Sequence, residues 1–309
     1  MRRAADVALL VNPTAGRGRG ARWSSVVADR LGAAGSAVEV LVGSSADDAL
    51  ALARTAVAAG VPTLVAVGGD GLVHVAVQAV AGQPVLLGLV PAGTGNDFAR
   101  ALGIPLGDPL AAADIVLAGH SAAVDAGRVT GPNISASRLP GPNIAERWFA
   151  GVLAAGFDSQ VNERANTMRG RAGRGTYVLA MLSELRTLRP IPYEVTIDGE
   201  RLDLQAVLVA VANIASYGGG MRIAPSASPT DGLLEVTVVG AVSRTELVRV
   251  FPRIYNGSFV RHPAVRQLRA RDIGLAADGV VAYADGERIG PLPLTVSVVP
   301  GALRVAVPR

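Results

Sequence analysis

A Gly-Gly-Asp-Gly segment, Gly68–Gly71, directly follows an apolar run that has the length of a buried β-strand. Glycines let the backbone approach phosphate groups closely and direct amide N–H groups at them, and a carboxylate there can hold the magnesium that accompanies ATP. An ordinary strand-to-helix turn would have the same composition, and short glycine motifs often match by chance. Taken alone, the segment leaves the phosphate site and the plain turn as equal alternatives.

Two further glycine-bearing segments also follow predicted strands: Asn12–Gly16 (NPTAG) and Pro91–Arg100 (PAGTGNDFAR). Each could be a plain loop, because Asn-Pro and Gly-Thr-Gly are common in turns, and the pair Asn96 and Asp97 could cap a helix. The carboxyl ends of parallel strands lie at one edge of a sheet, which is where open α/β sheets bind ligands. A single ligand spanning all three segments is therefore the economical interpretation.

Short Val- and Leu-rich runs alternate with Ala-rich stretches of helical length over roughly the first 120 residues. The predicted strands are Val7–Val11, Val38–Val42, Thr63–Val67 and Leu86–Val90, and the predicted helices are Arg22–Leu31, Asp47–Ala59, Leu72–Val80, Thr94–Leu102 and Asp108–Ala118. This alternation predicts an α/β fold whose N-terminal part is a doubly wound, Rossmann-like parallel sheet.

Alternating strands dominate after about Val124 and predict a C-terminal β-rich, sandwich-like domain. Two of these strands are predicted at Arg147–Ala154 and Leu275–Ala284, and helical patches are predicted at Asp158–Leu188 and Arg244–Ile254. We expect an α/β domain over residues 1–124 and a β-rich domain over residues 125–299, with the last residues, 300–309, packing back on the first domain.

Composition restricts the possible chemistry of the 309-residue chain. It has no cysteine, which excludes disulfides, thiolate zinc sites and a cysteine nucleophile. All 29 basic residues are arginine, so a Walker lysine, a Schiff-base lysine and a lysine general base are excluded too. Any phosphate contacts must come from arginine, backbone amides or metal.

The sequence pI is near 10.1 although the net charge is only +4, a balance that suits an anionic membrane surface or nucleic acid. Arginines concentrate in Arg164–Arg189 and Arg261–Arg271, where a solvated surface and a lipid-docking surface are about equal alternatives. Nucleic acid is disfavoured because aromatic residues are not interleaved with these arginines. No apolar run is long enough to span a bilayer, so we expect a cytoplasmic protein that touches membranes peripherally.

Six segments occur in an order that resembles the diacylglycerol kinase catalytic-domain family of bacterial soluble lipid kinases, a family related to sphingosine kinases and NAD kinases. The segments are NPTAG, GGDGLVHVAV, PAGTGNDFAR, AVDAGRV, GGGMRIAPSASPTDGLLEV and YADGE. The resemblance implies an ATP- and Mg-dependent lipid kinase of phospholipid metabolism, with the β-rich domain binding the lipid. It also makes a homodimer plausible.

The resemblance further implies which residues form the site. The nucleotide contacts would be Asn12, Pro13, Thr14, Ala15, Gly16, Gly68, Gly69, Asp70, Gly71, Leu72, Val73 and Thr94. Glu287 would be the general base, and Asp70 and Asp125 would organise the catalytic magnesium and its waters. A structural magnesium would bind the Asp231 carboxylate and backbone oxygens of Ser228 and Leu233, supported by Asp285.

The chain departs from the commonest form of the family's second motif, in which Gly-Gly-Asp-Gly-Thr is followed by Asn-Glu. It has Leu72 and His74, which resemble the sphingosine and ceramide kinase version, and Val75 in place of the glutamate. An NAD kinase-like enzyme and a nucleotide-binding regulator with degraded catalysis are the alternatives, the second supported only by Val75. The sequence does not identify the lipid.

Overall fold

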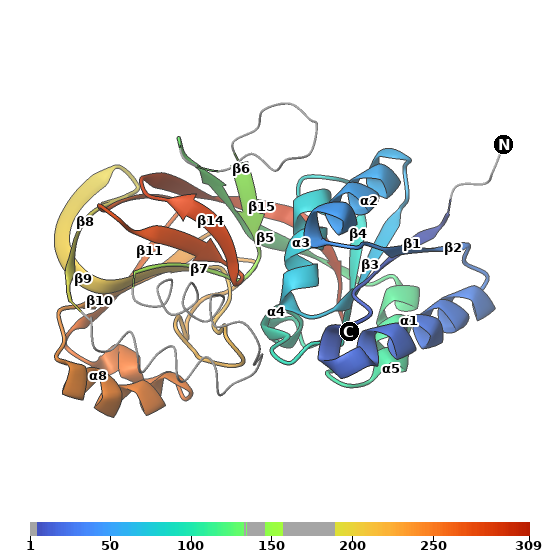
Figure 1. Cartoon of the computed structure of the whole chain (residues 1–309), viewed down its shortest axis with the longest axis horizontal. Coiled ribbons are helices and arrows are strands. Elements are labelled where there is room, and N and C mark those ends of the chain that lie inside the picture. The colour runs from blue at the N-terminus through green and yellow to red at the C-terminus, as the bar shows by residue number, and fades with distance from the viewer. Residues whose placement is uncertain (1–4, 133, 135–145, 157–188) are drawn as a thin grey trace.

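The computed structural model describes residues 5–132, 134, 146–156 and 189–309 (Figure 1). The N-terminal part is a parallel sheet in the order β4-β3-β1-β2, formed by β1 (Val7–Val11), β2 (Val38–Val42), β3 (Thr63–Gly68) and β4 (Leu86–Pro91). Its helices are α1 (Ala15–Ala33), α2 (Ala46–Ala58), α3 (Asp70–Val80), α4 (Asp97–Ala101) and α5 (Pro109–Ala118).

Helices cover both faces of this sheet, with α1 packing beside α5 and α2 beside α3 (Figure 1). All five residues of β1 are buried, as expected for a parallel strand covered on both faces. The predicted doubly wound α/β sheet is therefore confirmed.

The C-terminal part is β-rich, as predicted. Its antiparallel strands are β5 (Ser121–Thr130), β6 (Glu146–Phe149), β7 (Val152–Gly156), β8 (Ile191–Ile197), β9 (Glu200–Ala212), β10 (Leu234–Gly240), β11 (Val265–Ala270), β12 (Asp272–Ala276), β13 (Val281–Ala284), β14 (Glu287–Pro291) and β15 (Leu294–Ala306). A short helix, α8 (Arg244–Val250), and two 3-10 turns, η1 (Phe251–Ile254) and η2 (Ser258–Arg261), lie between β10 and β11.

Two long strands join the two parts of the molecule. β15 pairs antiparallel with β5, and at its end Arg304 and Val305 pair parallel with Leu86 and Leu87 of β4. The chain thus returns to the edge of the N-terminal sheet (Figure 1). The predicted boundary between residues 124 and 125 falls inside β5, and it remains a prediction.

Two strand predictions were wrong in the same way, because each joined two strands into one. The segment predicted as Arg147–Ala154 is interrupted between β6 and β7, where backbone N–H groups donate to the carboxylate of Asp285. The segment predicted as Leu275–Ala284 is interrupted by a turn in which Gly279 has φ +69°. The helical patch predicted at Asp158–Leu188 lies outside the described residues.

Candidate active site

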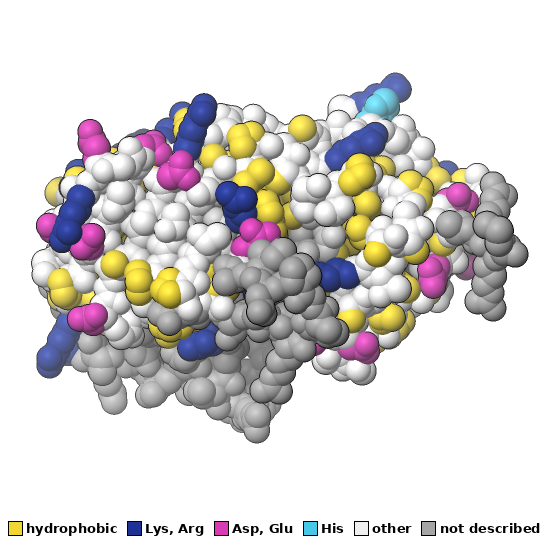
Figure 2. All heavy atoms as spheres, turned by 90° about the horizontal axis from the view of Figure 1, so that it is seen from above, with side chains coloured by type: hydrophobic (Ala, Val, Ile, Leu, Met, Phe, Trp, Pro, Cys, Tyr) yellow, Lys and Arg dark blue, Asp and Glu magenta, His cyan; other side chains and the backbone are white. Residues whose placement is uncertain are grey.

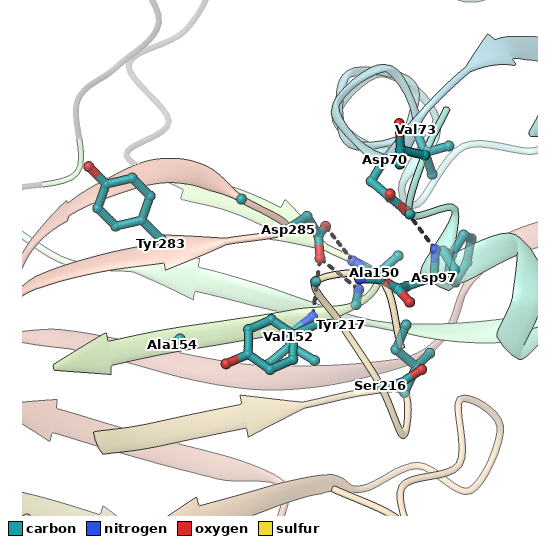
Figure 3. A pocket seen from close by; sticks show the side chains of 18 residues that line it. Asp70, Val73, Asp97, Ala150, Val152, Ala154, Ser216, Tyr217, Tyr283 and Asp285 are labelled. Atoms are coloured by element: carbon teal, nitrogen blue, oxygen red, sulfur yellow. Dashed lines mark hydrogen bonds between the residues drawn. The ribbon is translucent and has the colours of Figure 1, made fainter. Parts of the chain in front are cut away.

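A cavity of about 380 Å³ opens between the two parts of the molecule (Figure 3). The α/β part contributes the start of α3 and the loop before α4: Asp70, Val73, Thr94, Gly95, Asp97 and Phe98. The β-rich part contributes three segments: Ala150, Gly151, Val152 and Ala154, then Ile214 and Ser216–Gly219, then Tyr283, Asp285 and Gly286. Carboxylates therefore stand at one end of a wall that is otherwise mainly apolar.

Asp70 is the first residue of α3, and its carboxylate faces the start of α4. The backbone N–H of Asn96 donates to its Oδ2 at 2.7 Å, and that of Asp97 donates to its Oδ1 at 2.8 Å. A Cβ atom on Gly95 would lie only 2.6 Å from Oδ2, so the close approach requires glycine there. Burial raises the pKa of Asp70, and the nearby charges of Asp97 and Asp285 act in the same direction.

The three glycine-bearing loops meet at one edge of the sheet. A Cβ atom on Gly93 would lie 2.4 Å from the Cα of Gly69, and one on Gly16 would lie 2.1 Å from the carbonyl oxygen of Ala92. Arg19 connects two of the loops, because it donates from Nε to Gly16 O and from Nη2 to Gly93 O, both at 3.1 Å. These are the close backbone approaches that a phosphate-binding edge needs.

The first loop is ordered by its own side chains and lies beside the cavity without lining it. Asn12 accepts at Oδ1 from the backbone N–H of Thr14 at 3.1 Å and from its hydroxyl at 2.8 Å. Of the predicted nucleotide contacts, Asp70, Val73 and Thr94 line the cavity. The remaining predicted contacts are Asn12–Gly16, Gly68, Gly69, Gly71 and Leu72, which lie in these adjoining loops and at the start of α3.

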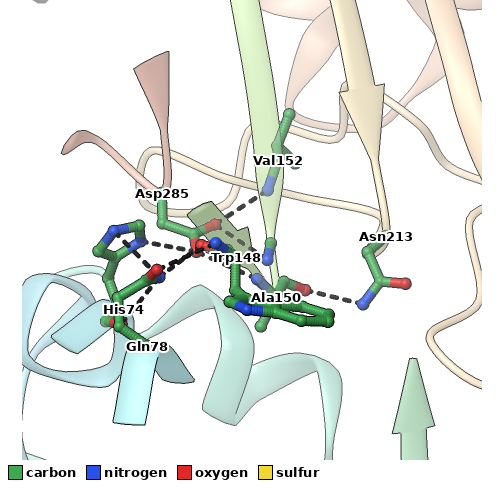
Figure 4. A network of polar contacts seen from close by, with 8 residues as sticks. His74, Gln78, Trp148, Ala150, Val152, Asn213 and Asp285 are labelled. Atoms are coloured by element: carbon green, nitrogen blue, oxygen red, sulfur yellow. Dashed lines mark hydrogen bonds and ion pairs between the residues drawn. The ribbon is translucent and has the colours of Figure 1, made fainter. Parts of the chain in front are cut away.

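Asp285 occupies the turn between β13 and β14, where it has φ +52°. Its carboxylate accepts the backbone N–H groups of Ala150 at 3.1 Å, Gly151 at 2.9 Å and Val152 at 3.1 Å (Figure 4). These bonds explain the interruption between β6 and β7. The structure places Asp285 at the cavity, and none of these contacts involves the loop around Asp231.

Helix α3 reaches the β-rich part through two further side chains that the sequence did not identify as a pair. His74 Nδ1 lies 3.3 Å from Asp285 Oδ2, and Gln78 both donates to Trp148 O at 2.6 Å and accepts from Trp148 N at 3.0 Å (Figure 4). The helical spacing of residues 70, 74 and 78 was the available signal, since it places them along one side of α3.

Asp97 was considered in the sequence only as part of a helix cap. Its side chain is buried, accepts the backbone N–H of Gly219 at 2.7 Å and pairs with Arg100 at 2.8 Å. The side chain of Asn96 makes no capping bond and binds Gly93 instead. The carboxylate that accepts the N–H groups at the start of α4 is that of Asp70. Asp97 is therefore a further acidic residue of the cavity wall.

Glu287 begins β14, and its side chain is exposed beside the start of α3. Its Oε1 lies 3.4 Å from the point where a Cβ atom on Gly71 would stand. The structure thus brings Glu287, Asp70 and Asp285 to the same region, although Glu287 comes from the opposite domain to Asp70.

Asp125 and Asp231 lie together at a different place and do not line the cavity. Asp125 is buried, and its two carboxylate oxygens accept the N–H groups of Gly232 at 2.7 Å and Gly301 at 2.8 Å. Asp231 accepts the N–H of Leu233 at 3.1 Å and forms an ion pair with Arg269. Asp125 therefore fastens the loop that contains Asp231 to β15.

The fit of magnesium differs between these two regions. No three acidic or histidine side chains converge on a ready-made metal site within the part of the chain that the structure describes. Magnesium is usually held by one or two carboxylates together with substrate phosphates, and the buried Asp70 beside the glycine loops fits that arrangement. At Asp231 the guanidinium of Arg269 already supplies positive charge, and a magnesium ion would have to displace it. Ser228, which is predicted to bind this magnesium through its backbone oxygen, places its side-chain hydroxyl 3.4 Å from that of Thr230.

The departure at Val75 has a structural explanation. Val75 is buried in α3, together with its apolar neighbours Leu72, Val73, Ala76 and Val77. An apolar side chain fits this packed position, so Val75 gives no reason to expect a degraded site.

Known proteins are similar to this chain over nearly its whole length. A diacylglycerol kinase of Mycobacterium tuberculosis is 42% identical over 304 residues, covering 98% of this chain and 95% of the relative. A diacylglycerol kinase of Bacillus subtilis is 28% identical over 290 residues, covering 92% and 90%. A solved structure of a diacylglycerol kinase from Bacillus anthracis supports the fold, with a TM-score of 0.71 over 98% of this chain and 96% of that chain at 21% identity.

Family models cover both parts of the molecule. Residues 6–129 match the diacylglycerol kinase catalytic domain, and residues 151–307 match the YegS C-terminal NAD kinase beta sandwich-like domain. The resemblance inferred from the six ordered segments is thus confirmed. The chain belongs to the diacylglycerol kinase family.

Proposed function

We propose that this chain is an ATP-dependent lipid kinase that transfers the γ-phosphoryl group to a lipid hydroxyl, with diacylglycerol as the acceptor. The observation that carries the proposal is the cavity in which Asp70 and the third glycine-bearing loop, with Thr94 and Gly95, face a mainly apolar wall of the other domain. The side with Asp70 and the glycine-bearing loop suits a triphosphate, and the mainly apolar wall suits a lipid. No observation favours NAD or a regulatory role over this reaction.

The nucleotide phosphates would lie along the edge where the three loops meet. Backbone amides at Gly69–Gly71 can donate to phosphate oxygens, since glycine leaves room for close approach. In the first loop, the N–H groups of Asn12, Thr14 and Ala15 already donate within the protein, so its predicted nucleotide contacts stay a proposal. Arg19 holds the loops and brings a positive charge to the same edge. Thr94 belongs to the third loop and lines the cavity, so its hydroxyl can contact the phosphates or the acceptor.

Magnesium belongs to the proposal as the ion that neutralises phosphate charge when it is bound. Asp70 would hold it on the side of the cavity, where the N–H groups of Asn96 and Asp97 fix the orientation of the carboxylate. The predicted roles of Asp125 in the catalytic metal site and of Ser228, Asp231 and Leu233 in a structural one stay proposals.

Glu287 would act as the general base. The acceptor hydroxyl loses its proton to the Glu287 carboxylate as its oxygen forms a bond to the γ-phosphorus. The bond between that phosphorus and the bridging oxygen breaks, and ADP leaves with the electron pair. Asp285 positions the turn that carries Glu287, because three backbone N–H groups fix the Asp285 carboxylate.

The apolar part of the wall would contact the lipid near its hydroxyl. Val73, Phe98, Val152 and Ile214 supply this surface from both domains. A lipid acceptor also implies work at a membrane surface, so the cytoplasmic, peripheral location and the possible homodimer remain part of the proposal. None of the described helices has the length and apolar character needed to cross a bilayer.

The direct test supplies labelled ATP and magnesium with diacylglycerol in mixed micelles. Label should move to the lipid, and Glu287→Gln should reduce kcat about 10²–10⁴-fold, the usual contribution of a general base, while ATP binding persists. NAD in place of lipid is the control acceptor. Transfer to NAD and not to lipid would contradict the proposal, and full turnover in Glu287→Gln would exclude Glu287 as the base.

A further inference from the structure

The short helix α8 and the turn that follows it form an exposed surface with no buried residue in the helix itself. Val248 and Tyr255 have exposed fractions of 52% and 54%, which makes them two of the most exposed large apolar residues of the described chain. The backbone stays helical through Phe251 and Tyr255, so Val248, Pro252 and Tyr255 follow one face, with Arg244 one turn before Val248. Exposed apolar side chains gathered on one face are typical of a surface that binds a partner.

Arginines flank this stripe. Arg244, Arg249 and Arg253 are all exposed, and in the described part of the chain none of them forms an ion pair. We define the α8 face as Arg244, Val248, Arg249, Arg253 and Tyr255.

The one acidic residue between Gly240 and Ala264 is Glu246, and it is already engaged. It bonds with Ser243 in a capping box, and its Oε1 lies 3.0 Å from Nε2 of His262. Within the described segment 240–264, the α8 face is therefore positive and apolar, and its one acidic residue is already engaged. On the opposite side of the β-rich part, acidic and basic side chains are interspersed (Figure 2).

The α8 face is also connected to the cavity. The backbone N–H of Arg222 donates to the carbonyl of Ile254 in η1 at 2.9 Å. Arg222 belongs to the same loop as Ile214, Tyr217 and Gly219, which line the cavity. Figure 1 shows α8 projecting from the outer edge of the β-rich part, with that loop between it and the α/β part. Whatever binds α8 is thus held close to the wall that would receive the acceptor.

We propose that the α8 face docks the enzyme on an anionic lipid bilayer, an inference that rests on the proposed lipid kinase function. Tyrosine with an apolar body and a polar tip suits the membrane interface, and Val248 beside it adds apolar area. Arginines next to such a stripe are attracted by anionic headgroups, as in amphipathic helices that lie in the interface. Docking there brings the cavity to the surface in which its acceptor is dissolved.

The test measures co-sedimentation of the full chain with vesicles of phosphatidylcholine alone and with added phosphatidylglycerol. Arg249→Ala combined with Arg253→Ala should raise the lipid concentration for half-maximal binding to anionic vesicles roughly 10- to 30-fold at low salt. Val248→Ser combined with Tyr255→Ser should weaken binding to anionic vesicles as well. Arg201→Ala combined with Arg304→Ala removes two exposed arginines elsewhere and should leave binding unchanged.

Three results would overturn the inference: unchanged binding of the α8 variants, an equal loss in the control pair, or absence of anionic-vesicle binding by the native chain. A change of oligomeric state without lipid in the α8 variants would assign the face to contacts between copies instead. Turnover of a short-chain diacylglycerol in neutral detergent micelles separates this proposal from the reaction. The α8 variants should retain that turnover. A native chain that binds vesicles but transfers no phosphate to lipid would contradict the proposed function and leave the docking surface intact.

Discussion

Asp70 and Asp125 accept the same kind of hydrogen bonds in different surroundings. Each carboxylate receives two backbone N–H groups, one on each oxygen, at 2.7 and 2.8 Å. Asp70 lines the cavity next to Asp97 and Asp285, whereas Asp125 is only 3% exposed and holds the loop of Asp231 to β15. The comparison teaches that the hydrogen-bond pattern of an aspartate does not reveal its role. Access to the cavity distinguishes the two.

Among the variants that test this comparison, Asp70→Asn should have the largest effect. We expect kcat to fall about 10²–10³-fold, because the substitution removes the carboxylate proposed to hold magnesium at the phosphate-binding edge, where one preorganised electrostatic group is commonly worth that much. Lipid transfer at saturating ATP and magnesium measures it. Activity within a few-fold of the native value would mean that Asp70 is a structural aspartate and does not hold magnesium for the reaction.

His74→Ala should have the next largest effect on activity. It removes the contact between α3 and Asp285 and frees the turn that carries Glu287, so we expect kcat to fall about 10-fold or more, since small displacements of catalytic groups cost up to about 10²-fold. The KM for ATP should change little, because His74 does not line the cavity.

His74→Asn is the matched control, because the asparagine amide can replace Nδ1 as the donor to Asp285. It should recover part of the lost kcat. If both variants lose activity equally together with thermal stability, His74 is a packing residue and does not position the turn.

Asp125→Asn should act mainly on stability. An amide nitrogen would face one of the two N–H groups that the carboxylate now accepts, which leaves a buried donor without a partner at a cost of about 1–3 kcal/mol. Chemical denaturation measures this loss, and kcat of the folded fraction should stay near the native value. A large loss of kcat at unchanged stability would instead support the predicted role of Asp125 in the catalytic metal site.

The smallest effect concerns pH. Because the pKa of Asp70 is raised in the folded state from its ordinary value of 3.8, the folded chain binds more protons than the unfolded chain above that pH. Stability therefore falls as pH rises from 3.8 through the folded pKa. Asp70→Asn removes this dependence, so its stability relative to the native chain should improve as pH rises from 3.8 through the raised pKa of Asp70. A constant difference across that range would show that the pKa is not raised.

The alternation of apolar runs and helical stretches determined the doubly wound sheet, because buried parallel strands and their covering helices have distinct local patterns. It also placed Gly68–Gly71 and Pro91–Arg100 at the ends of neighbouring strands. The order of six segments determined the family. Strand interruptions such as the one at Ala150 and Gly151 could not be predicted, because the group that causes it, Asp285, lies more than a hundred residues away.

Only the tertiary structure decided which acidic residues share a cavity. Asp70 lies beside Asp97 and Asp285 at the cavity, whereas Asp125, in the middle of β5, binds the loop of Asp231. The contact of His74 with Asp285 joins residues 211 positions apart in the chain. Local sequence specifies helices, strands and turns, but the pairing of β15 with β5 brings the two domains together. That pairing joins residues far apart in the chain and depends on long-range packing, so no single segment of the sequence indicates it.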